Sequence, residues 1–188
     1  MVYKIFYFCK RFFQTWELNN HNKFIREKII SAGGNIGSGG LFGRNVVLSG
    51  MAKVNIGNNV HIGTGSFIRG EGGLTIGDNT IISRNLLLYT VNHDYEGTLL
   101  PFDRNNIFRP VAIEKNVWIG MNVTICPGTK IGEGAIIGMG TIVYGSVPKF
   151  AMIGSNHWEI IKYRNTQHYN QLNDNKMFAR VGGHPLNP

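Results

Sequence analysis

Between residues 113 and 144 an aliphatic side chain returns at every sixth position. A period of six is too short for a helical repeat, but it suits one short strand followed by one tight turn, with the aliphatic side chain pointing inward each time. Three such units close a triangular coil of about 18 residues, and stacked coils pair as parallel strands roughly 4.8 Å apart. The pattern therefore predicts a parallel β-helix with an aliphatic interior. The expected vertical pairs are Ile113 with Ile131, Ile119 with Ile137, and Ile125 with Val143.

The same period is readable nearer the N-terminus. It runs from Ile56, shifts its phase by two residues at Glu71–Gly73, and resumes at Ile76. Gly and Asn crowd the positions between the aliphatic residues, and both tolerate positive φ, so they suit tight corners. We expect an imperfect start near Ile36, with a disturbance through Gly39 and Gly40, and an end near Val147 and Pro148. We interpret these Gly and Asn residues as structural.

One segment interrupts the repeat and two flank it. Residues 94–110 have no sixfold pattern, and a long excursion from a regular scaffold is a place to look for function. Residues 156–176 are predicted to form a helix that covers the open last coil, whose strand edges would otherwise be unpaired. The expected organisation is an N-terminal helical segment over 1–32, a β-helix over 33–153 with a protruding loop, and a C-terminal helix and tail over 154–188.

The first 30 residues form an aromatic, basic segment that we expect to be helical. A second short helix is expected over residues 22–32, ended by Gly33 and Gly34. The apolar residues on one broad face are Ile5, Phe6, Phe8, Phe12, Phe13, Trp16 and Leu18. We expect this face to pack on the β-helix or on a neighbouring subunit. The alternative is a peripheral membrane contact through residues 1–18, because aromatic side chains with basic neighbours suit a headgroup layer.

The formal net charge of +8 favours an anionic ligand, a nucleic acid or an acidic membrane surface as a partner. Nucleic acid is disfavoured, because no binding motif appears and the positive residues form no run. The chain has only two cysteines, and no stretch of about 18 uninterrupted apolar residues occurs. The expected location is therefore the reducing cytoplasm, with association at the inner face of the membrane as the alternative.

Among the six histidines, His93 is distinguished by its position. It closes one unit of the repeat and opens the irregular segment, so its imidazole could act as a general base beside a cleft. The alternative is a surface or hydrogen-bonded turn histidine. We interpret His61 as structural or subunit-facing and Cys126 as a small core residue. No third ligand accompanies His61 and His93, so no metal site is predicted.

The repeats resemble the hexapeptide-repeat acyltransferases of left-handed β-helix fold, among them the maltose, galactoside and polysaccharide O-acetyltransferases. The resemblance covers about residues 55–165, and the left-handed sense is implied by it. The matching motifs are Asn92–His93, Asn116–Gly120 (NVWIG), Pro127–Gly128, Ile131–Gly132, Ile137–Gly140 (IGMG), Val147–Pro148 and Ile161–Arg164 (IKYR). Residues 154–159 depart from it, since this segment is one residue longer than in the family.

The resemblance implies a direct acetyl transfer from acetyl-CoA to a hydroxyl group, without an acyl-enzyme and without a metal. His93 would take the proton of the acceptor hydroxyl, and the N–H of Met121 would stabilise the charge that develops on the thioester oxygen. The implied acetyl-CoA contacts are Trp118, Gly120, Met121, Met139, Gly140, Tyr144, Gly145, Lys162 and Arg164, the last two at the phosphates. The nearest candidates for holding the acceptor are Asn92, Asp94 and Tyr95.

The family also implies a homotrimer with active sites between its subunits, and a carbohydrate acceptor. The expected function is O-acetylation of a sugar hydroxyl in a surface or capsular polysaccharide or in its precursor. One alternative is an acyltransferase of the same fold with another acceptor, such as an amino sugar or another small molecule. A second is a non-catalytic β-helix scaffold, and a third is a zinc hydratase.

Overall fold

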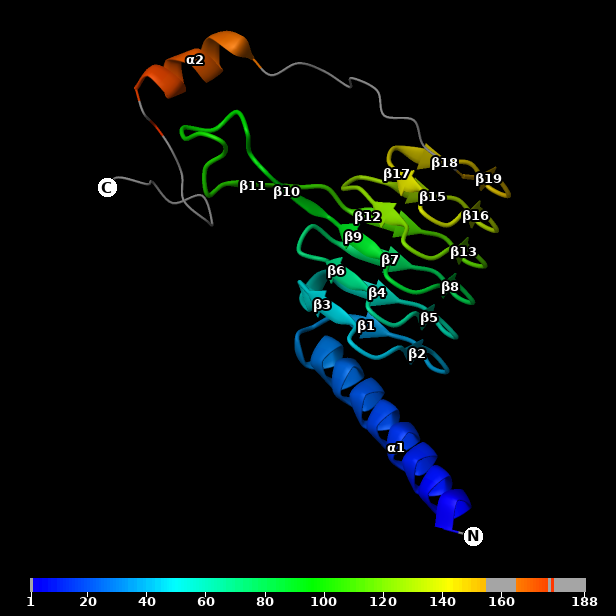
Figure 1. Ribbon diagram of the computed structural model, residues 1–188. Helices are drawn as coiled ribbons and strands as arrows, with labels where there is room; N and C mark the ends of the chain where they lie inside the picture. Colours follow the sequence, from blue (N-terminus) through cyan, green and yellow to red (C-terminus); the bar gives the residue numbers. More distant parts are fainter. Residues whose placement is uncertain (1, 155–164, 176, 178–188) are drawn as a thin grey trace.

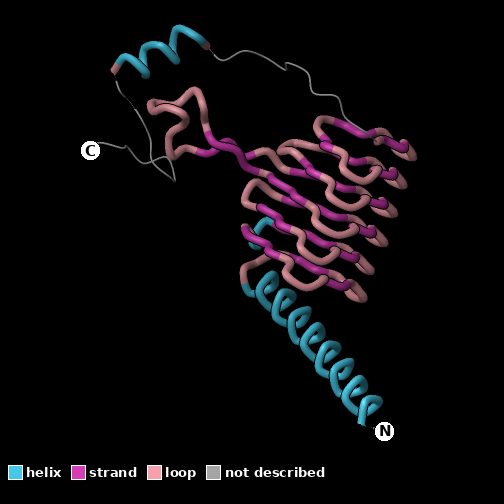
Figure 2. The backbone as a smooth tube through the Cα atoms, in the orientation of Figure 1, coloured by secondary structure: helices cyan, strands magenta, loops and turns pink. Residues whose placement is uncertain are grey.

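The computed structural model describes residues 2–154, 165–175 and 177, and its main body is a parallel β-helix (Figures 1 and 2). The strands stack into three parallel sheets, which we name A, B and C. Sheet A contains β1 (Asn35–Ile36), β4 (Val54–Ile56), β7 (Leu74–Ile76), β12 (Val111–Ile113), β15 (Lys130–Ile131) and β18 (Ser146–Val147). Sheet B contains β2 (Leu41–Phe42), β5 (His61–Ile62), β8 (Ile81–Ile82), β13 (Trp118–Ile119), β16 (Ile136–Ile137) and β19 (Met152–Ile153). Sheet C contains β3 (Val47–Ser49), β6 (Phe67–Arg69), β9 (Leu87–Tyr89), β14 (Thr124–Ile125) and β17 (Ile142–Val143).

The predicted register of the coils is confirmed. Ile113 pairs with Ile131, Ile119 with Ile137, and Ile125 with Val143. The side chains at these positions are buried and form one continuous aliphatic core along the axis. Each coil therefore contributes one inward side chain from each sheet, together with corner side chains such as Val117 and Val123, and its stability depends on the coils directly above and below it.

The repeat begins near Ile36, as expected, but its first coil is more regular and its last coil ends later than expected. Ile36 pairs with Ile56 and Phe42 with Ile62, so the first coil is regular and Gly39–Gly40 is an ordinary corner. The period of six was hidden there because an aromatic residue, Phe42, takes the inward place of an isoleucine. At the other end β19 pairs with β16 beyond Val147, so the repeat continues to residue 153.

Asparagine residues form vertical ladders at two corners of the β-helix. Asn59, Asn79 and Asn116 all have positive φ, between 54° and 60°, as tight corners require. The Asn59 amide donates to the Asn79 side chain at 3.1 Å, and the Asn79 amide donates to the Asn116 side chain at 3.2 Å. The Asn85 amide likewise donates to Asn122 at 3.0 Å. Asparagine is thus used both for its backbone conformation and for contacts between coils.

A single helix, α1 (Val2–Ser31), precedes the β-helix. The expected second helix over 22–32 is wrong, because those residues continue α1, which ends before Gly33 at a φ of 94°. Ile25 and Ile29 are buried against the first coil, and Asn22 exchanges two hydrogen bonds with the backbone of Phe42, at 2.6 and 3.0 Å. The last third of α1 therefore closes the N-terminal end of the core, while its first part extends away (Figure 1). Among the described residues no helix has the length and apolar character that crossing a bilayer requires.

The segment after β9 leaves the β-helix as a protruding arm. It begins and ends with an antiparallel pair, β10 (Val91–His93) and β11 (Asn106–Phe108), before the chain re-enters the coil at β12. The 3₁₀ helix η1 (Met51–Lys53) fills the same corner, between sheets C and A, in the first coil. This corner, which we call the C–A corner, is where the chain adds residues to the basic coil.

The C-terminal helix does not cover the last coil. Within the described residues it spans α2 (Thr166–Asp174), and it lies beside the tip of the arm (Figure 1). His168 Nε2 lies 2.8 Å from the carbonyl oxygen of Gly97, and the N–H of Leu100 donates to the carbonyl of Met177. Leu172 of this helix is buried as well. The predicted capping role was therefore wrong. Part of the helix expected over 156–176 lies outside the described residues.

Asp103 organises the tip of the arm, and its replacement by Asn is expected to loosen this segment. The Thr98 N–H, at 3.0 Å, lowers the pKa of Asp103, burial opposes this, and the Asn105 N–H at 2.8 Å lowers it further. A carboxyl group whose pKa is lowered by folding stabilises the folded state at any pH above its unfolded pKa of about 3.9. This stabilisation is lost as the pH falls through the pKa of the folded state. Proteolysis of the arm at pH 7 should be faster in Asp103→Asn, and the difference should shrink toward pH 3. Equal cleavage at pH 7 would contradict this role.

Candidate functional site

The outer faces of the three sheets differ in polarity. Sheet A presents a largely polar row: Asn35, Asn55, Thr75, Ala112, Lys130 and Ser146. Sheet B presents Leu41, His61, Ile81, Trp118, Ile136 and Met152. Sheet C presents Val47, Phe67, Leu87, Thr124 and Ile142. Most of the large apolar side chains in the rows on sheets B and C are more than a third exposed. The edge where sheets B and C meet, which we call the B–C corner, is thus flanked by two apolar faces, and such faces mark interaction surfaces.

Gly120 and Met121 lie at the B–C corner directly after β13. Gly120 donates its N–H to Ile137 and Asn122 donates to Arg84, but the N–H of Met121 has no hydrogen-bond partner among the described residues. The carbonyl of Met121 accepts the N–H of Gly140 from the next coil at 2.8 Å. The corner therefore holds an available backbone donor on a rigid support, which is what stabilisation of a developing oxyanion requires.

A glycine is needed at position 120 because the coils approach closely there. A Cβ atom added to Gly120 would lie 2.6 Å from the backbone nitrogen of Met139. Gly120→Ala should therefore displace the Met121 corner and cost about 1–3 kcal/mol of unfolding free energy, the usual range for overpacking. Gly154 occupies the same corner position in the last coil, where an added Cβ would meet no described residue closer than 3.9 Å. Gly154→Ala is the matched control, and an equal loss in chemical denaturation of both variants would contradict this account.

His93 lies elsewhere, at the end of β10 on the C–A corner. Its ring stacks on Phe102 with the ring centroids 3.8 Å apart and the planes inclined by 9°. Its Nδ1 atom is buried and has no hydrogen-bond partner among the described residues. The imidazole is thus held by its ring face, and the strand pair β10–β11 fixes its backbone.

Of the three predicted acceptor residues around His93, two line one pocket and the third does not. Asn92 and Tyr95 line a pocket of about 220 Å³ together with Ile107, Arg109 and Pro127. Asn92 precedes His93 on a strand, where adjacent side chains point to opposite faces, and His93 does not line this pocket. Asp94 accepts the N–H of Glu96 at 3.0 Å and stabilises the start of the arm.

The predicted coenzyme residues are divided between two corners. Trp118 is exposed on sheet B, and Met121, Met139 and Gly140 follow at the B–C corner. Tyr144 and Gly145 lie at the C–A corner, between β17 and β18. Two further predicted contacts, Lys162 and Arg164, lie outside the described residues. Within one chain, His93 and Met121 are thus on opposite edges of sheet C.

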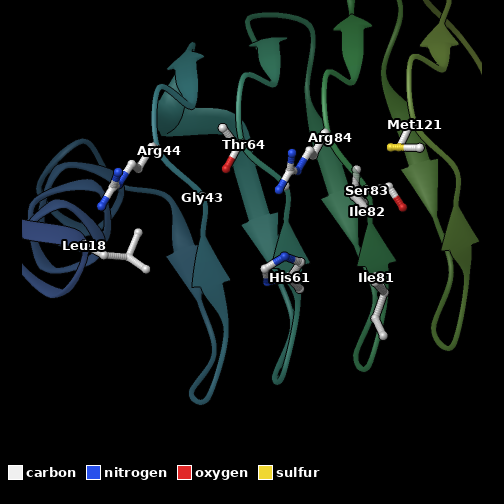
Figure 3. A pocket seen from close by; sticks show the side chains of 11 residues that line it. Leu18, Gly43, Arg44, His61, Thr64, Ile81, Ile82, Ser83, Arg84 and Met121 are labelled. Atoms are coloured by element: carbon white, nitrogen blue, oxygen red, sulfur yellow. The ribbon is translucent and has the colours of Figure 1, made fainter. Parts of the chain in front are cut away.

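Sequence reasoning missed a groove that extends from Met121 toward the N-terminal coils (Figure 3). It has a volume of about 800 Å³, and two arginines, Arg44 and Arg84, line it. The remaining lining residues are Leu18, Gly43, His61, Gly63, Thr64, Ile81, Ile82, Ser83 and Met121. The missed signal was the position in the coil. In four successive coils, the residue two positions after the inward residue of sheet B lines the groove, and these residues are Arg44, Thr64, Arg84 and Met121. In the described part of the chain, no three His, Cys, Asp or Glu side chains are grouped to hold a metal ion.

A three-sided parallel β-helix built from six-residue units with glycine at its corners is the architecture of hexapeptide-repeat proteins. Residues 110–145 match the family model "Bacterial transferase hexapeptide (six repeats)", and residues 53–89 match "Hexapeptide repeat of succinyl-transferase". These two segments of the chain therefore carry the hexapeptide repeats of such transferases.

Named relatives agree with this assignment. The chain is 34% identical over 112 residues to galactoside O-acetyltransferase of Escherichia coli, covering 56% of this chain and 55% of that protein. It is 32% identical over 132 residues to the putative lipopolysaccharide biosynthesis O-acetyl transferase WbbJ of Escherichia coli, covering 66% and 64%. The matches span about half to two thirds of the length of these relatives.

The fold is also found in solved structures. A hexapeptide-repeat containing acetyltransferase of Vibrio cholerae, solved with acetyl coenzyme A, has a TM-score of 0.59 and 26% identity over 65% of this chain and 66% of that chain. A galactoside acetyltransferase in complex with coenzyme A has a TM-score of 0.61 over 87% of this chain and 78% of that chain. At 24% identity the second likeness concerns the fold alone.

Proposed function

We propose that the protein is an acetyl-CoA-dependent O-acetyltransferase that acts on a sugar hydroxyl, in a surface polysaccharide or in its precursor. The observation that carries the proposal is the N–H of Met121, which no described residue accepts and which is held at a rigid corner between two exposed apolar faces. Acetyltransferase relatives, two of them named as O-acetyltransferases of a galactoside and of lipopolysaccharide biosynthesis, support the reaction class.

The position of His93 supports a site shared between copies of the chain. His93 lies on the C–A corner and Met121 on the B–C corner, so a general base and an oxyanion donor from one chain are on opposite edges of sheet C. A second copy that covers the apolar face of sheet C could bring its C–A corner to this B–C corner. A closed ring of copies satisfies every such interface, and the family resemblance implies three copies, so the proposed assembly is a homotrimer.

The reaction follows from these groups. Neutral His93 takes the proton from the acceptor hydroxyl as its oxygen attacks the thioester carbonyl. The N–H of Met121 donates to the carbonyl oxygen as negative charge develops there. The new ester C–O bond forms, the C–S bond breaks, and the imidazolium returns the proton to the departing thiolate, which gives free coenzyme A. Trp118, Met139 and Gly140 lie along the same corner, where the coenzyme arm would run.

An amino-sugar acceptor is the second candidate, since a structure of the same fold with a TM-score of 0.56, an N-acyltransferase of Bacillus cereus, was solved with dTDP and coenzyme A. A non-catalytic scaffold is the third candidate, and it predicts no coenzyme A binding. The test is an acetyl-CoA assay across a panel of glycans and amino sugars, with mass detection of the product. O-acetylated sugar is the expected product. N-acetylated product alone would favour the second candidate, and the absence of both product and coenzyme A binding would favour the third.

A further inference from the structure

The groove on the N-terminal side of Met121 extends over four successive coils of the β-helix (Figure 3). Arg44, Thr64, Arg84 and Met121 occupy equivalent corner positions, so Arg44 and Met121 are separated by three coil steps of roughly 4.8 Å each. Its volume of about 800 Å³ lies within the usual range for small-molecule sites. The groove is therefore large enough for a sugar with a further substituent.

The groove is chemically suited to an anion. No acidic residue lines it, whereas Arg44, Arg84 and His61 do. Within the described residues Arg84 has no carboxylate partner, and Arg44 reaches Glu17 only at 3.9 Å, between exposed side chains. Such an exposed pair is weak and can be exchanged for a ligand. Guanidinium groups bind carboxylate and phosphate oxygens in a fixed, directional geometry.

Backbone N–H donors add to the attraction of these basic side chains for an anion. The N–H groups of Thr64 and Arg84 have no hydrogen-bond partner among the described residues. Glycines on the preceding coils leave them uncovered: a Cβ on Gly43 would lie 2.3 Å from the Thr64 nitrogen, and one on Gly63 would lie 2.7 Å from the Arg84 nitrogen. Backbone N–H groups that are free to donate can hydrogen-bond to the oxygens of an anion that is bound beside them.

We propose that this groove binds an anionic group, a carboxylate or a phosphate, carried by the acceptor, and that Arg84 is the residue that recognises it. The inference rests on the proposed function, because Met139 and Gly140 place the coenzyme on the C-terminal side of Met121. The groove extends to the other side, and Arg84 is one coil step from Met121. The acceptor class is then an acidic or phosphorylated sugar.

The test compares glucuronic acid and glucose 6-phosphate with glucose, using the full chain and acetyl-CoA. The wild type should favour one of the anionic sugars at least about tenfold in kcat/KM, and Arg84→Gln should reduce this preference about tenfold to a hundredfold. The KM for acetyl-CoA should stay unchanged. Lys130→Gln removes an equal charge from the exposed face of sheet A, outside the groove, and should keep the preference. The results for glucuronic acid and for glucose 6-phosphate distinguish a carboxylate from a phosphate.

Two results would overturn the inference. One is a preference for glucose, or a preference for an anionic sugar that Arg84→Gln leaves intact. The other is a rise in the KM for acetyl-CoA in Arg84→Gln without a change in acceptor preference, which would assign the groove to the coenzyme. If no sugar is acetylated, the proposed function has failed. Calorimetric measurement of the binding of the same sugars to the wild type and to Arg84→Gln then tests whether the groove binds an anion, independently of catalysis. Equal binding of charged and neutral sugars then contradicts it.

Discussion

Replacing His93 by alanine should reduce acetyl transfer at least about a hundredfold, the lower range for loss of a general base. Without the imidazole, no group at this corner takes the proton from the attacking hydroxyl, so kcat should fall while the KM for acetyl-CoA changes little. The measurement is release of free coenzyme A thiol under saturating acetyl-CoA, with the best acceptor from the glycan panel.

A structural role for His93 predicts a different outcome. Its ring stacks on Phe102, so the variant could loosen the arm instead of removing a base. Added imidazole distinguishes the two roles, because it can replace a missing base but cannot restore the stacked arrangement. Phe102→Leu is the matched control: it removes the aromatic partner and keeps the base, so most of the activity should remain. Undiminished thiol release in His93→Ala would exclude the proposed mechanism.

A carboxylate introduced on the outer face of sheet C should reduce activity by preventing assembly of the subunits, without removing a catalytic group. Leu87 lies in the apolar row of this face and is 39% exposed in the single chain. In a trimer that buries this face, Leu87→Asp would place an unpaired charge in the interface at a cost of several kcal/mol. We expect monomers and at least about a hundredfold loss of acetyl transfer. Thr75→Asp is the matched control, because Thr75 is exposed on the polar face of sheet A and the variant should remain trimeric and active.

Light scattering and circular dichroism together test this prediction. The expected result for Leu87→Asp is a folded chain of about one third of the wild-type mass, since the inward core is untouched. Full activity of a monomeric variant would contradict a site shared between subunits. Mixed trimers formed from His93→Ala and Gly120→Ala chains offer a second check. They should regain part of the activity, because some interfaces combine an intact His93 with an intact Met121 corner.

The fold could be predicted from the sequence because its rule is local and repeated. Each inward side chain reappears after six residues, and the register of the coils from Ile113 onward follows from that spacing. The same reasoning failed at Phe42, where an aromatic side chain fills the inward position, and at β19, because the corner between β17 and β18 just before it is shortened. A pattern based on isoleucine does not recognise such substitutions, although the core accepts them.

The candidate site was less accessible to the same reasoning. The order of His93, Trp118 and Met121 along the chain does not reveal that they occupy different edges of one sheet. The groove that contains Arg84 depends on which corners are superimposed, and the extra residues in the early coils conceal this in a reading by sixes. The contact between α2 and the arm depends on His168 and Gly97, which are far apart in sequence and carry no periodic signal.

The C–A corner absorbs changes in chain length. The early coils repeat after 20 residues, as in the Asn59–Asn79 pair, whereas the later ones repeat after 18, as in the Ile113–Ile131 pair, and the whole arm is inserted between β9 and β12. The rows of sheets B and C stay aligned across all of these changes. Acceptor specificity could therefore evolve by lengthening, shortening or exchanging one corner, while the coenzyme surface and the core are inherited unaltered.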